Sequence, residues 1–386
     1  MKAKLRIVSV VGARPNLMKL APFAGQMAEY GEVIDHFVVH TGQHYDENMS
    51  KAFFAELDIP APDVDLGVGS GSHAEQVGRT MIEFEKVLRQ WKPDWVVVVG
   101  DVNAACACAI TAKKERLRCA HIEAGLRSFD LDMPEEINRM VADRLSDVLF
   151  TPDELADANL RAEGAAPARI RRVGNIMIDT LDRESPRARA LDPRRIAAAH
   201  LAGARAAASL PPLADDQFAA LTLHRPSNVD DPATLRRLAD LLVGEIARDL
   251  PLVWPLHPRT RKQLDAAGLT GRLQACANVV MTEPLGYSEM LRLNMGARVM
   301  LTDSGGLQEE CCVLGTPCLT LRPNTERPAT LIDHGGTCVL VGNDADRIRA
   351  AFAKARATPR SPHRPPLWDG HTAERITAFF SSIAAA

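Results

Sequence analysis

Short apolar runs recur through the first part of the chain, and longer stretches with a helical spacing of apolar residues separate them. We predict strands at residues 6–11, 36–40, 95–99, 119–123 and 148–151, with helices between them. This alternation is typical of an α/β domain built on a doubly wound parallel sheet.

The same alternation restarts after a stretch rich in Arg, Ala and Pro at residues 181–217, which we interpret as a connector. Strands are predicted at residues 218–223, 251–256, 278–281, 298–301, 317–321 and 338–341. The pattern therefore predicts one domain at residues 1–180 and another at 218–371, with a cleft between their facing strand ends.

The composition is that of an ordinary folded protein, because 46% of the 386 residues are hydrophobic and 25% are charged. A formal net charge of -3 gives no general attraction to nucleic acid or to an anionic membrane. We find neither an export signal nor a transmembrane span, so we expect a cytoplasmic protein. The 8 cysteines lack zinc-ligand spacing, and we expect buried, reduced thiols.

Four carboxylates are predicted to converge near the ends of two strands and the start of one helix: Asp101, Glu123, Glu135 and Glu136. Asp132 or the neighbouring backbone is expected to cap that helix, and Pro134 suits its first turn. The apolar positions of the helix are Ile137, Met140, Val141 and Leu145. Ligands of open α/β sheets bind at such strand ends, so we expect an active site here.

These acids also have plainer interpretations. Acidic residues such as Glu135 and Glu136 are stabilised in a first helical turn by the helix dipole, by about 0.3–1 kcal/mol each. Glu123 is either buried and paired, with Arg127 or Arg139 as partner, or takes part in catalysis.

Two strand-to-helix turns are candidate anion sites. The first is neither GxGxxG nor a P-loop, yet Arg14 and Lys19 lie where its helix starts. In the second, Ser304-Gly305-Gly306, the N–H groups of a new helix attract a diphosphate, and Glu310 is placed to accept ribose hydroxyls. The alternatives are solvated helix charges and a plain Gly-rich turn. Further polar residues follow other predicted strands: Gln43, His44, His224, Arg225, His257, Arg322 and Arg327.

Ordered motifs cover nearly the whole chain: GARPNLMK, TGQHYDENMS, GDVN, HIEAGLRSFDLDMPEEINR, VGNIMID, TLHRPSNVD, LTDSGGLQEE and TERP. Together they resemble the non-hydrolysing UDP-N-acetylglucosamine 2-epimerases. The resemblance implies an α/β fold of the GT-B type, with two Rossmann-like doubly wound domains and an interdomain cleft. It also implies a C-terminal helix at residues 372–386 that packs back on the first domain.

The resemblance implies a role for particular residues. Catalysis is assigned to Asp101, Glu123, Glu135 and His224. UDP binding is assigned to Arg14, Lys19, His224, Ser304, Gly305, Gly306 and Glu310. A regulatory substrate site is assigned to Gln43, His44, Glu136, Arg225 and His257. The family implies a homodimer that needs neither a cofactor nor a metal and supplies cell-surface polysaccharide precursors.

The implied reaction is reversible epimerisation at C2, through elimination of UDP to 2-acetamidoglucal and its re-addition. The better-known bacterial members carry an acid at Asn16 and hydroxyl residues at Val102-Asn103, so the exact sugar stays open. A related branch acts on UDP-linked diacetamido uronic acids. A GT-B glycosyltransferase is the alternative from another class, since it shares the nucleotide site but needs an acceptor.

Overall fold

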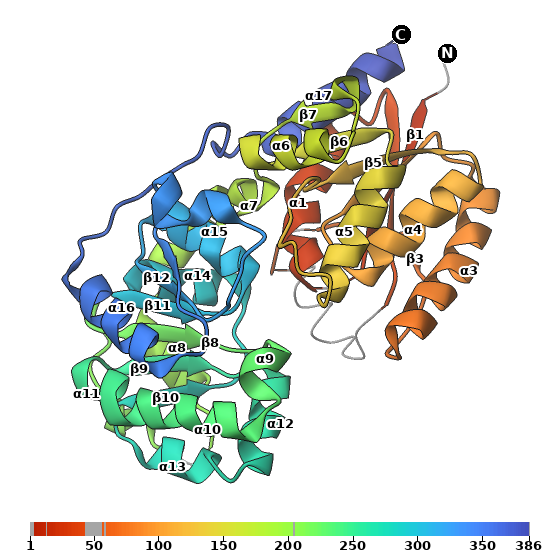
Figure 1. Cartoon of the computed structure of the whole chain (residues 1–386). Coiled ribbons are helices and arrows are strands. Elements are labelled where there is room, and N and C mark those ends of the chain that lie inside the picture. Colours follow the sequence, from red (N-terminus) through yellow and green to blue (C-terminus); the bar gives the residue numbers. More distant parts are fainter. Residues whose placement is uncertain (1–3, 13, 43–55, 58, 204, 386) are drawn as a thin grey trace. The chain divides into compact units, whose positions relative to one another are not determined.

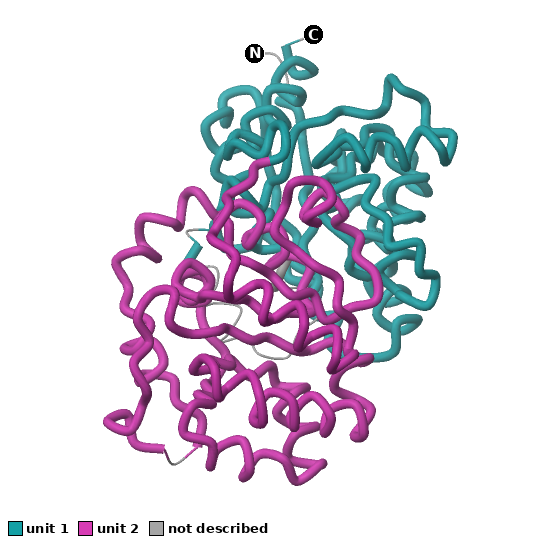
Figure 2. The backbone as a smooth tube through the Cα atoms, turned by 60° about the vertical axis from the view of Figure 1, so that its left-hand side comes forward, with its two compact units in different colours: residues 1–180, 365–386 teal, residues 181–364 magenta. Residues whose placement is uncertain are grey.

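The computed structural model describes residues 4–12, 14–42, 56–57, 59–203 and 205–385 (Figure 1). The chain divides into two compact units (Figure 2): unit 1 comprises Met1–Thr180 and Pro365–Ala386, and unit 2 comprises Leu181–Arg364. The predicted connector at 181–217 lies within unit 2. Residues 365–371, which we predicted in the second domain, lie in unit 1.

Unit 1 is built on a seven-stranded parallel sheet with the order β3-β2-β1-β4-β5-β6-β7. Its strands are β1 (Leu5–Val11), β2 (Ile34–His40), β3 (Val64–Asp65), β4 (Trp95–Val99), β5 (Arg118–Ile122), β6 (Val148–Thr151) and β7 (Ile170–Arg172). The five predicted strands match β1, β2, β4, β5 and β6 to within two residues at each end. The two unpredicted strands are at the sheet edges and are very short.

Helices cover both faces of this sheet. They are α1 (Arg14–Glu29), α3 (His73–Trp91), α4 (Asn103–Lys114), α5 (Pro134–Leu145), α6 (Glu154–Ala162), η1 (Pro167–Arg169) and α17 (Thr372–Ala385). α4 packs between α3 and α5, whereas α17 packs beside α1 (Figure 1). Buried apolar residues such as Val8, Val98 and Phe84 fill the space between the sheet and its helices.

Unit 2 contains a six-stranded parallel sheet with the order β10-β9-β8-β11-β12-β13. Its strands are β8 (Ala219–Thr222), β9 (Leu252–Pro255), β10 (Val279–Thr282), β11 (Val299–Thr302), β12 (Cys318–Thr320) and β13 (Cys338–Leu340). All six were predicted from the sequence pattern. α7 (Ile176–Arg189) crosses the boundary between the units.

The remaining helical segments belong to unit 2. They are α8 (Pro193–Ala199), η2 (Ala207–Ser209), α9 (Pro226–Val229), α10 (Pro232–Leu241), η3 (Leu242–Ile246), α11 (Ala247–Asp249), α12 (Pro258–Ala266), α13 (Thr270–Ala275), α14 (Tyr287–Gly296), α15 (Gly305–Leu314), η4 (Pro328–Thr330), η5 (Ile332–His334) and α16 (Ala345–Ala357). Two apolar clusters, centred on Trp254 and Phe218, fill opposite faces of the sheet.

Both sheets have the Rossmann strand order, in which the first strand is central and the chain proceeds outward from it in both directions. The predicted α/β fold with two Rossmann-like domains is therefore confirmed. The order reverses between β1 and β4 in unit 1, and between β8 and β11 in unit 2. Ligands of such sheets bind at the carboxyl ends of the strands beside this switch point.

Helix α5 differs from its prediction. Of the two predicted caps, the Asp132 side chain is not used: the N-cap is Met133, whose side chain caps no amide, and Pro134 occupies the first turn as expected. Its buried residues are mostly polar: Glu136, Asn138, Arg139, Ala142 and Asp143. Ile137 and Met140, which we took as part of the apolar face, are 50% and 42% exposed. The helix is turned in this way because its carboxylates and guanidinium pair with groups at the strand ends, which the apolar spacing does not reveal.

Helix α17 closes an aromatic cluster in unit 1. The ring of Phe380 lies 5.5 Å from that of Trp95, 6.0 Å from Phe150 and 6.4 Å from Phe23. The neighbouring Phe379 ring lies 5.4 Å from Phe150. The edge-on and tilted arrangements are those that aromatic rings prefer. The end of the chain thus completes the core of its first unit.

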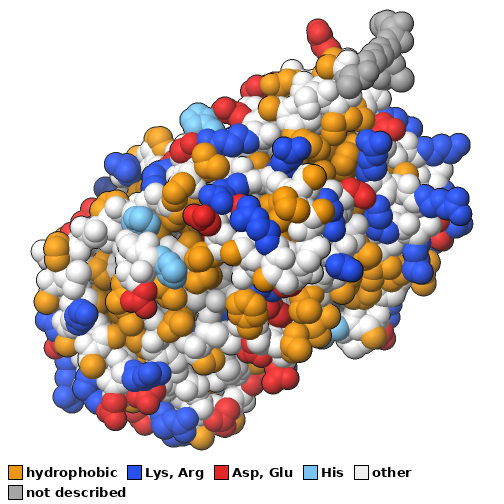
Figure 3. All heavy atoms as spheres, turned by 45° about the horizontal axis from the view of Figure 1, so that its top comes forward, with side chains coloured by type: hydrophobic (Ala, Val, Ile, Leu, Met, Phe, Trp, Pro, Cys, Tyr) orange, Lys and Arg blue, Asp and Glu red, His pale blue; other side chains and the backbone are white. Residues whose placement is uncertain are grey.

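Two general expectations concern thiols and the surface. All eight cysteines are free, and all but Cys276 are buried, which confirms buried thiols at those seven positions. No helix in the described part of the chain is long and apolar enough to cross a membrane. On the face drawn in Figure 3, basic and acidic side chains are interspersed.

Candidate active site

A buried ion pair lies at the carboxyl ends of β1 and β5, next to the switch point of unit 1. Lys19 Nζ donates to Glu123 Oε2, and the two side chains are 7% and 3% exposed. Glu123 adopts a φ of 71°, an uncommon conformation for a residue with a side chain. Strained backbone of this kind is concentrated at functional sites, which agrees with a role beyond packing.

Gly100 and Asn16 complete the surroundings of this pair. Gly100 has a φ of 67°, and a Cβ there would lie 3.0 Å from Lys19 Nζ and from Asn16 Nδ2. Asn16 Nδ2 donates to the Val99 carbonyl at 2.7 Å. The buried Asn16 Oδ1 has no hydrogen-bond partner among the described residues. The turn after β4 is therefore packed directly against the ion pair.

A second set of carboxylates is held by Arg139 of α5. Its Nε and Nη2 donate to Asp101 Oδ2 at 3.0 and 2.7 Å, and its Nη1 donates to Glu136 Oε2. The Glu136 carboxylate also accepts from the amides of Ser128 and Phe129 at 3.0 and 2.9 Å. Asp101 remains 24% exposed, whereas Glu136 is buried, so Glu136 fixes the loop before α5 while Asp101 is open to a ligand.

Glu123 is paired with Lys19, a partner that we did not predict from the sequence. Arg139 pairs with Asp101 and Glu136, and Arg127 pairs with Asp143 at 2.7 Å and with the exposed end of α6. Lys19, which we predicted as a UDP ligand, occupies that position instead. The sequence does not reveal the pairing because Lys19 and Glu123 are 104 residues apart.

The buried His121 side chain lies between Asp143 and the turn at Gly100. Its Nδ1 lies 2.7 Å from Asp143 Oδ1, and its Nε2 lies 2.8 Å from the Gly100 carbonyl oxygen. Burial alone would raise the pKa of Asp143, but His121 and Arg127 outweigh it and hold that pKa below its usual value. The turn that carries Asp101 is thus tied to the strand that carries Glu123.

Some predicted residues are only partly defined. Glu135 lies in the first turn of α5 and is partly exposed. Arg14 is the first residue of α1, but its side chain lies outside the described part of the structure. Gln43 and His44 also lie outside the described residues. Their assigned roles stay predictions.

In unit 2 the candidate diphosphate site is the N-terminus of α15, directly after β11. Ser304 is the N-cap, and its side chain caps no backbone amide. Gly305 and Gly306 form the start of the helix, where N–H groups point out of the helix end. This terminus lies at the switch point of the second sheet, as expected for an anion site.

The loop after β12 supports this helix start. Arg327 Nε lies 2.8 Å from Glu309 Oε1 in an ion pair, and Arg322 Nη2 donates to Glu326 Oε2 at 2.7 Å. All four side chains are buried. A Cβ on Gly305 would lie 2.6 Å from Glu326 Oε1. The two cations that we predicted in this loop are therefore paired with buried carboxylates against α15.

Asp303 and His224 form a pair at the ends of β11 and β8. Asp303 Oδ1 lies 2.8 Å from His224 Nδ1, and the carboxylate also accepts from the amides of His224 and Arg225 and from Asn228 Nδ2. Burial alone would raise the pKa of Asp303, but the His224 hydrogen bond and charge, with the other donors, lower it. We did not predict Asp303, although its position in the LTDSGG motif, directly before Ser304, was a signal.

Arg225 and His257 lie near this pair. The His257 ring centroid is 5.5 Å from that of His224, and His257 caps α12 by accepting from the Arg259 amide at 3.2 Å. Arg225 follows His224 in the same turn. Two predicted regulatory residues thus neighbour a predicted catalytic one within unit 2.

Glu310 lies deeper in α15. Asn294 Nδ2 donates to Glu310 Oε2 at 3.4 Å, and Tyr287 lies on the same side. Burial raises the pKa of Glu310 to about 7. A carboxylate with this environment gains from any hydroxyl that donates to it, which fits the predicted contact to a ribose.

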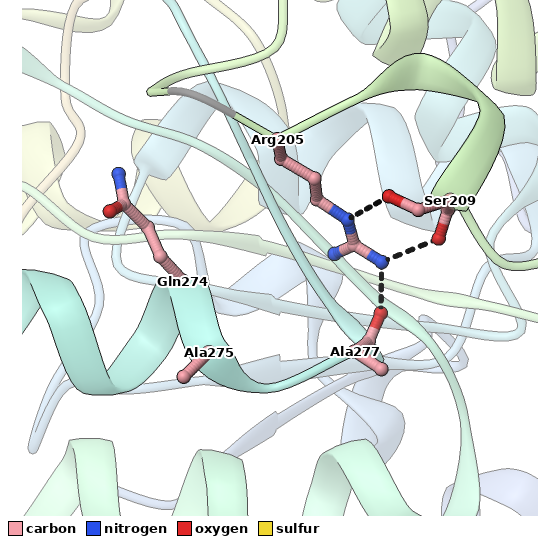
Figure 4. A pocket seen from close by; sticks show the side chains of 5 residues that line it. All are labelled: Arg205, Ser209, Gln274, Ala275 and Ala277. Atoms are coloured by element: carbon pink, nitrogen blue, oxygen red, sulfur yellow. Dashed lines mark hydrogen bonds between the residues drawn. The ribbon is translucent and has the colours of Figure 1, made fainter.

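A separate hollow of about 460 Å³ in unit 2 has no features of an active site. Figure 4 shows Arg205 at its side, with donors directed to Ser209 and to the Ala277 carbonyl. The same guanidinium donates to the Val279 carbonyl at 2.9 Å. Arg205 therefore joins backbone segments and is not presented to an anion.

The chain is similar in sequence to known proteins over most of its length. A family profile described as UDP-N-acetylglucosamine 2-epimerase matches residues 28–381. A UDP-N-acetylglucosamine 2-epimerase of Methanocaldococcus jannaschii is 40% identical over 373 residues, 96% of this chain and 98% of the relative. The UDP-2,3-diacetamido-2,3-dideoxy-D-glucuronate 2-epimerase of Pseudomonas aeruginosa is 38% identical over 346 residues, 89% of this chain and 90% of the relative.

Among solved structures, the crystal structure of Methanocaldococcus jannaschii UDP-GlcNAc 2-epimerase in complex with UDP-GlcNAc and UDP is similar to this chain. The match has a TM-score of 0.88 and 38% sequence identity. It covers 98% of this chain and 100% of that structure. The similarity therefore includes both units.

Proposed function

The chain belongs to the UDP-N-acetylglucosamine 2-epimerase family, and we propose that it interconverts UDP-N-acetylglucosamine and UDP-N-acetylmannosamine. The observation that carries the proposal is the coincidence of two features at two switch points. Carboxylates held by cations lie at one, and a helix N-terminus suited to a diphosphate lies at the other. A binding protein for UDP-sugars has no use for the first feature.

The chemistry explains why both features are needed. C2–H of an intact sugar ring is not adjacent to a carbonyl, so a carboxylate alone does not remove it. When the C1–O bond breaks, its electron pair leaves with UDP, and oxocarbenium character at C1 makes the C2 proton acidic. A carboxylate then takes this proton, and 2-acetamidoglucal remains. Proton delivery to the opposite face of C2 and re-addition of UDP to C1 give the epimer.

We assign proton transfer at C2 to Glu123, Glu135 and Asp101. Glu123 is supported by its buried pairing with Lys19 and its strained backbone, and Asp101 by its partial exposure beside Arg139. Each proton-transfer group of this kind contributes roughly 10²–10⁴-fold to the rate. The three side chains come from different segments around one strand edge, which suits delivery to two faces of a sugar.

We assign departure and return of UDP to unit 2. The N-terminus of α15 stabilises the negative charge that develops on the diphosphate, with Ser304 as an additional donor. Glu310 accepts hydroxyls of the ribose, and His224 contacts the leaving group. We also assign nucleotide binding to Arg14 and Lys19, at the start of α1.

The test is incubation with UDP-N-acetylglucosamine in D₂O, followed by separation of the UDP-sugars and mass analysis. We expect a second UDP-sugar that carries deuterium at C2, and slower labelling of the recovered substrate. No second UDP-sugar would contradict UDP-N-acetylglucosamine as the substrate. Epimerised product without deuterium at C2 would contradict the elimination mechanism but leave the reaction class intact.

A second candidate substrate is a UDP-linked diacetamido uronic acid. It is supported by the Pseudomonas aeruginosa relative, whose identity of 38% is close to the 40% of the Methanocaldococcus jannaschii relative. Asn16, an amide where better-known bacterial members carry an acid, lies against Lys19 and Gly100 at the reacting end of the sheet. Assay of both UDP-sugars at equal concentration decides between them through the ratio of their kcat/KM values.

We also propose that the protein is a homodimer. Four large apolar side chains are exposed along one continuous segment of unit 1: Phe129 at 75%, Leu131 at 65%, Ile137 at 50% and Met140 at 42%. Exposed apolar groups that are concentrated in this way are typical of a contact surface. Size-exclusion chromatography with light scattering should give twice the chain mass, and Ile137→Glu should give the monomer. A monomeric wild type would contradict the proposal.

A cytoplasmic location and a supply of cell-surface polysaccharide precursors complete the proposed function. Eight free thiols support a reducing compartment.

Regulation by a second substrate molecule, through Gln43, His44, Glu136, Arg225 and His257, is a separate proposal. It is tested by kinetics in the UDP-N-acetylmannosamine direction. Sigmoidal curves that become hyperbolic with traces of UDP-N-acetylglucosamine support it, and curves hyperbolic throughout contradict it.

A further inference from the structure

We propose that Asp303 is the positioning residue of His224: it holds the proton on Nδ1 and so makes Nε2 the ring nitrogen that meets the nucleotide. The inference rests on the proposed function, which places His224 at the leaving group. It concerns a residue that we did not predict from the sequence. Four observations on unit 2 support it.

The first observation is the number of donors that converge on Asp303. Its side chain is fully buried. His224 Nδ1 lies 2.8 Å from Oδ1, the Arg225 amide donates at 2.9 Å, and Asn228 Nδ2 donates at 3.0 Å. The His224 amide donates as well. Because every neighbour is a donor, only a group that accepts at both oxygens satisfies the site.

The second observation is the tautomer that follows from this arrangement. An ionised carboxylate is an acceptor only, so His224 Nδ1 must carry the proton between them. Nε2 then receives or donates on the opposite side of the ring, according to the charge of the imidazole. His224 is 34% exposed, so a ligand can approach the ring. A neutral amide at position 303 would instead place its NH₂ group against Nδ1 and move the proton to Nε2.

The third observation is the position of Asp303 in the chain. It is the residue directly before Ser304, the N-cap of α15. Thr222 and Thr302, which pair in register on the adjacent strands β8 and β11 shortly before His224 and Asp303, have their hydroxyl oxygens 2.6 Å apart. The imidazole and the candidate diphosphate site are thus fixed to each other through one buried residue.

The fourth observation is the remaining charge around the imidazole. His257 lies with its ring centroid 5.5 Å away, and Arg225 follows in the same turn. Both are able to carry positive charge, and Asp303 is the carboxylate in contact with the ring. The buried charge of Asp303 therefore lies beside basic side chains next to the diphosphate site.

The test separates a positioning role from a merely structural one by a double-mutant cycle. Asp303→Asn should lower kcat by roughly 10²–10⁴-fold in the wild-type background. In the His224→Gln background the same change should lower kcat by less than about threefold, because the imidazole it acts through is absent. Equal losses in both backgrounds would overturn the proposal. Asn228→Ala, which removes another donor to the same carboxylate, is the matched control and should retain kcat within about tenfold.

A spectroscopic measurement on the wild type does not depend on catalysis and uses a variant only to assign signals. In protein labelled with ¹⁵N-histidine, the His224 signals are assigned by their loss in His224→Gln. Nδ1 should carry a proton throughout the titration, in the neutral and in the charged ring. An unprotonated Nδ1 would overturn the proposal. If the wild type failed to epimerise any UDP-sugar, the proposed function would be lost, and this measurement would still decide the role of Asp303.

Discussion

The buried pair of Lys19 and Glu123 makes a quantitative prediction. Replacing Lys19 with Met keeps the length of the side chain and removes its ammonium group. Glu123, whose side chain is 3% exposed, then loses the ammonium group that contacts its Oε2. The surrounding strands leave little room for water to take that place, since Val98, Val99 and Ile122 are buried.

The expected cost follows from the burial of both partners. Removing one member of a buried ion pair typically destabilises a protein by about 3–5 kcal/mol, because the other charge stays uncompensated. For a unit of about 200 residues this corresponds to a fall in Tm of roughly 6–20 °C. The double variant Lys19→Met/Glu123→Gln leaves no unpaired charge and should be more stable than Lys19→Met alone.

Unfolding of unit 1 can be followed by tryptophan fluorescence. Trp91, Trp95 and Trp368 lie in unit 1, and Trp254 is the one tryptophan of unit 2. In a Trp254→Phe background the signal therefore reports on unit 1. Urea titrations of the variants in this background give the difference in the free energy of unfolding.

Lys86→Met provides the matched control. Lys86 pairs with Glu83 at 2.7 Å on α3, but these side chains are 65% and 40% exposed. Loss of such a surface pair should cost below about 1 kcal/mol. If Lys19→Met cost no more than Lys86→Met, the buried pair would contribute nothing special, and the argument from burial would be refuted.

Further predictions concern turnover, UDP binding and pH. Glu123→Gln and Glu135→Gln should each slow epimerisation by roughly 10²–10⁴-fold, with UDP affinity by calorimetry changed by less than about threefold; a parallel loss of affinity would assign them to binding instead. Ser304→Ala should affect UDP binding before turnover and raise the Kd for UDP, and an unchanged Kd would contradict the assignment of Ser304 to the UDP site. Gly305→Ala should weaken UDP binding further, because its Cβ would lie 2.6 Å from a buried carboxylate oxygen of the supporting loop, and wild-type affinity would contradict this. Burial raises the pKa of Glu310 from 4.5 to about 7, so the folded state binds this proton more tightly than the unfolded chain, and the stability of unit 2 should fall as pH rises between these values. Glu310→Gln should flatten that dependence in urea titrations, and an unchanged slope would refute the assignment.

The sequence predicts the central strands well because burial on both faces leaves a continuous apolar run. β4, with Trp95 and four valines, is the clearest case. The same pattern does not predict the edge strands β3 and β7. These strands have only two or three residues, pair with one neighbouring strand and tolerate polar residues. Periodicity thus reports the centre of each sheet and not its margins.

The candidate site divides in the same way. Positions at strand ends are predictable, so Asp101, Glu123 and Ser304 follow from the element pattern. Their partners do not, because the contact between Asp303 and His224 joins residues 79 apart in the sequence. The predicted apolar face of α5 was wrong at Ile137 and Met140 for a related reason. The buried residues of this helix are mostly polar, so its apolar spacing does not mark its buried face.

The position of α17 in unit 1 has a consequence for the synthesis of the protein. A ribosome makes Phe23, Trp95 and Phe150 early, but the helix that covers their rings comes after all of unit 2. At roughly 5–20 residues per second, the intervening stretch of about 200 residues takes about 10–40 s to translate. During that interval the nascent first unit exposes an aromatic surface to the cell. Its folding is completed only once α17 has been made, after the sequence of the second unit has already emerged.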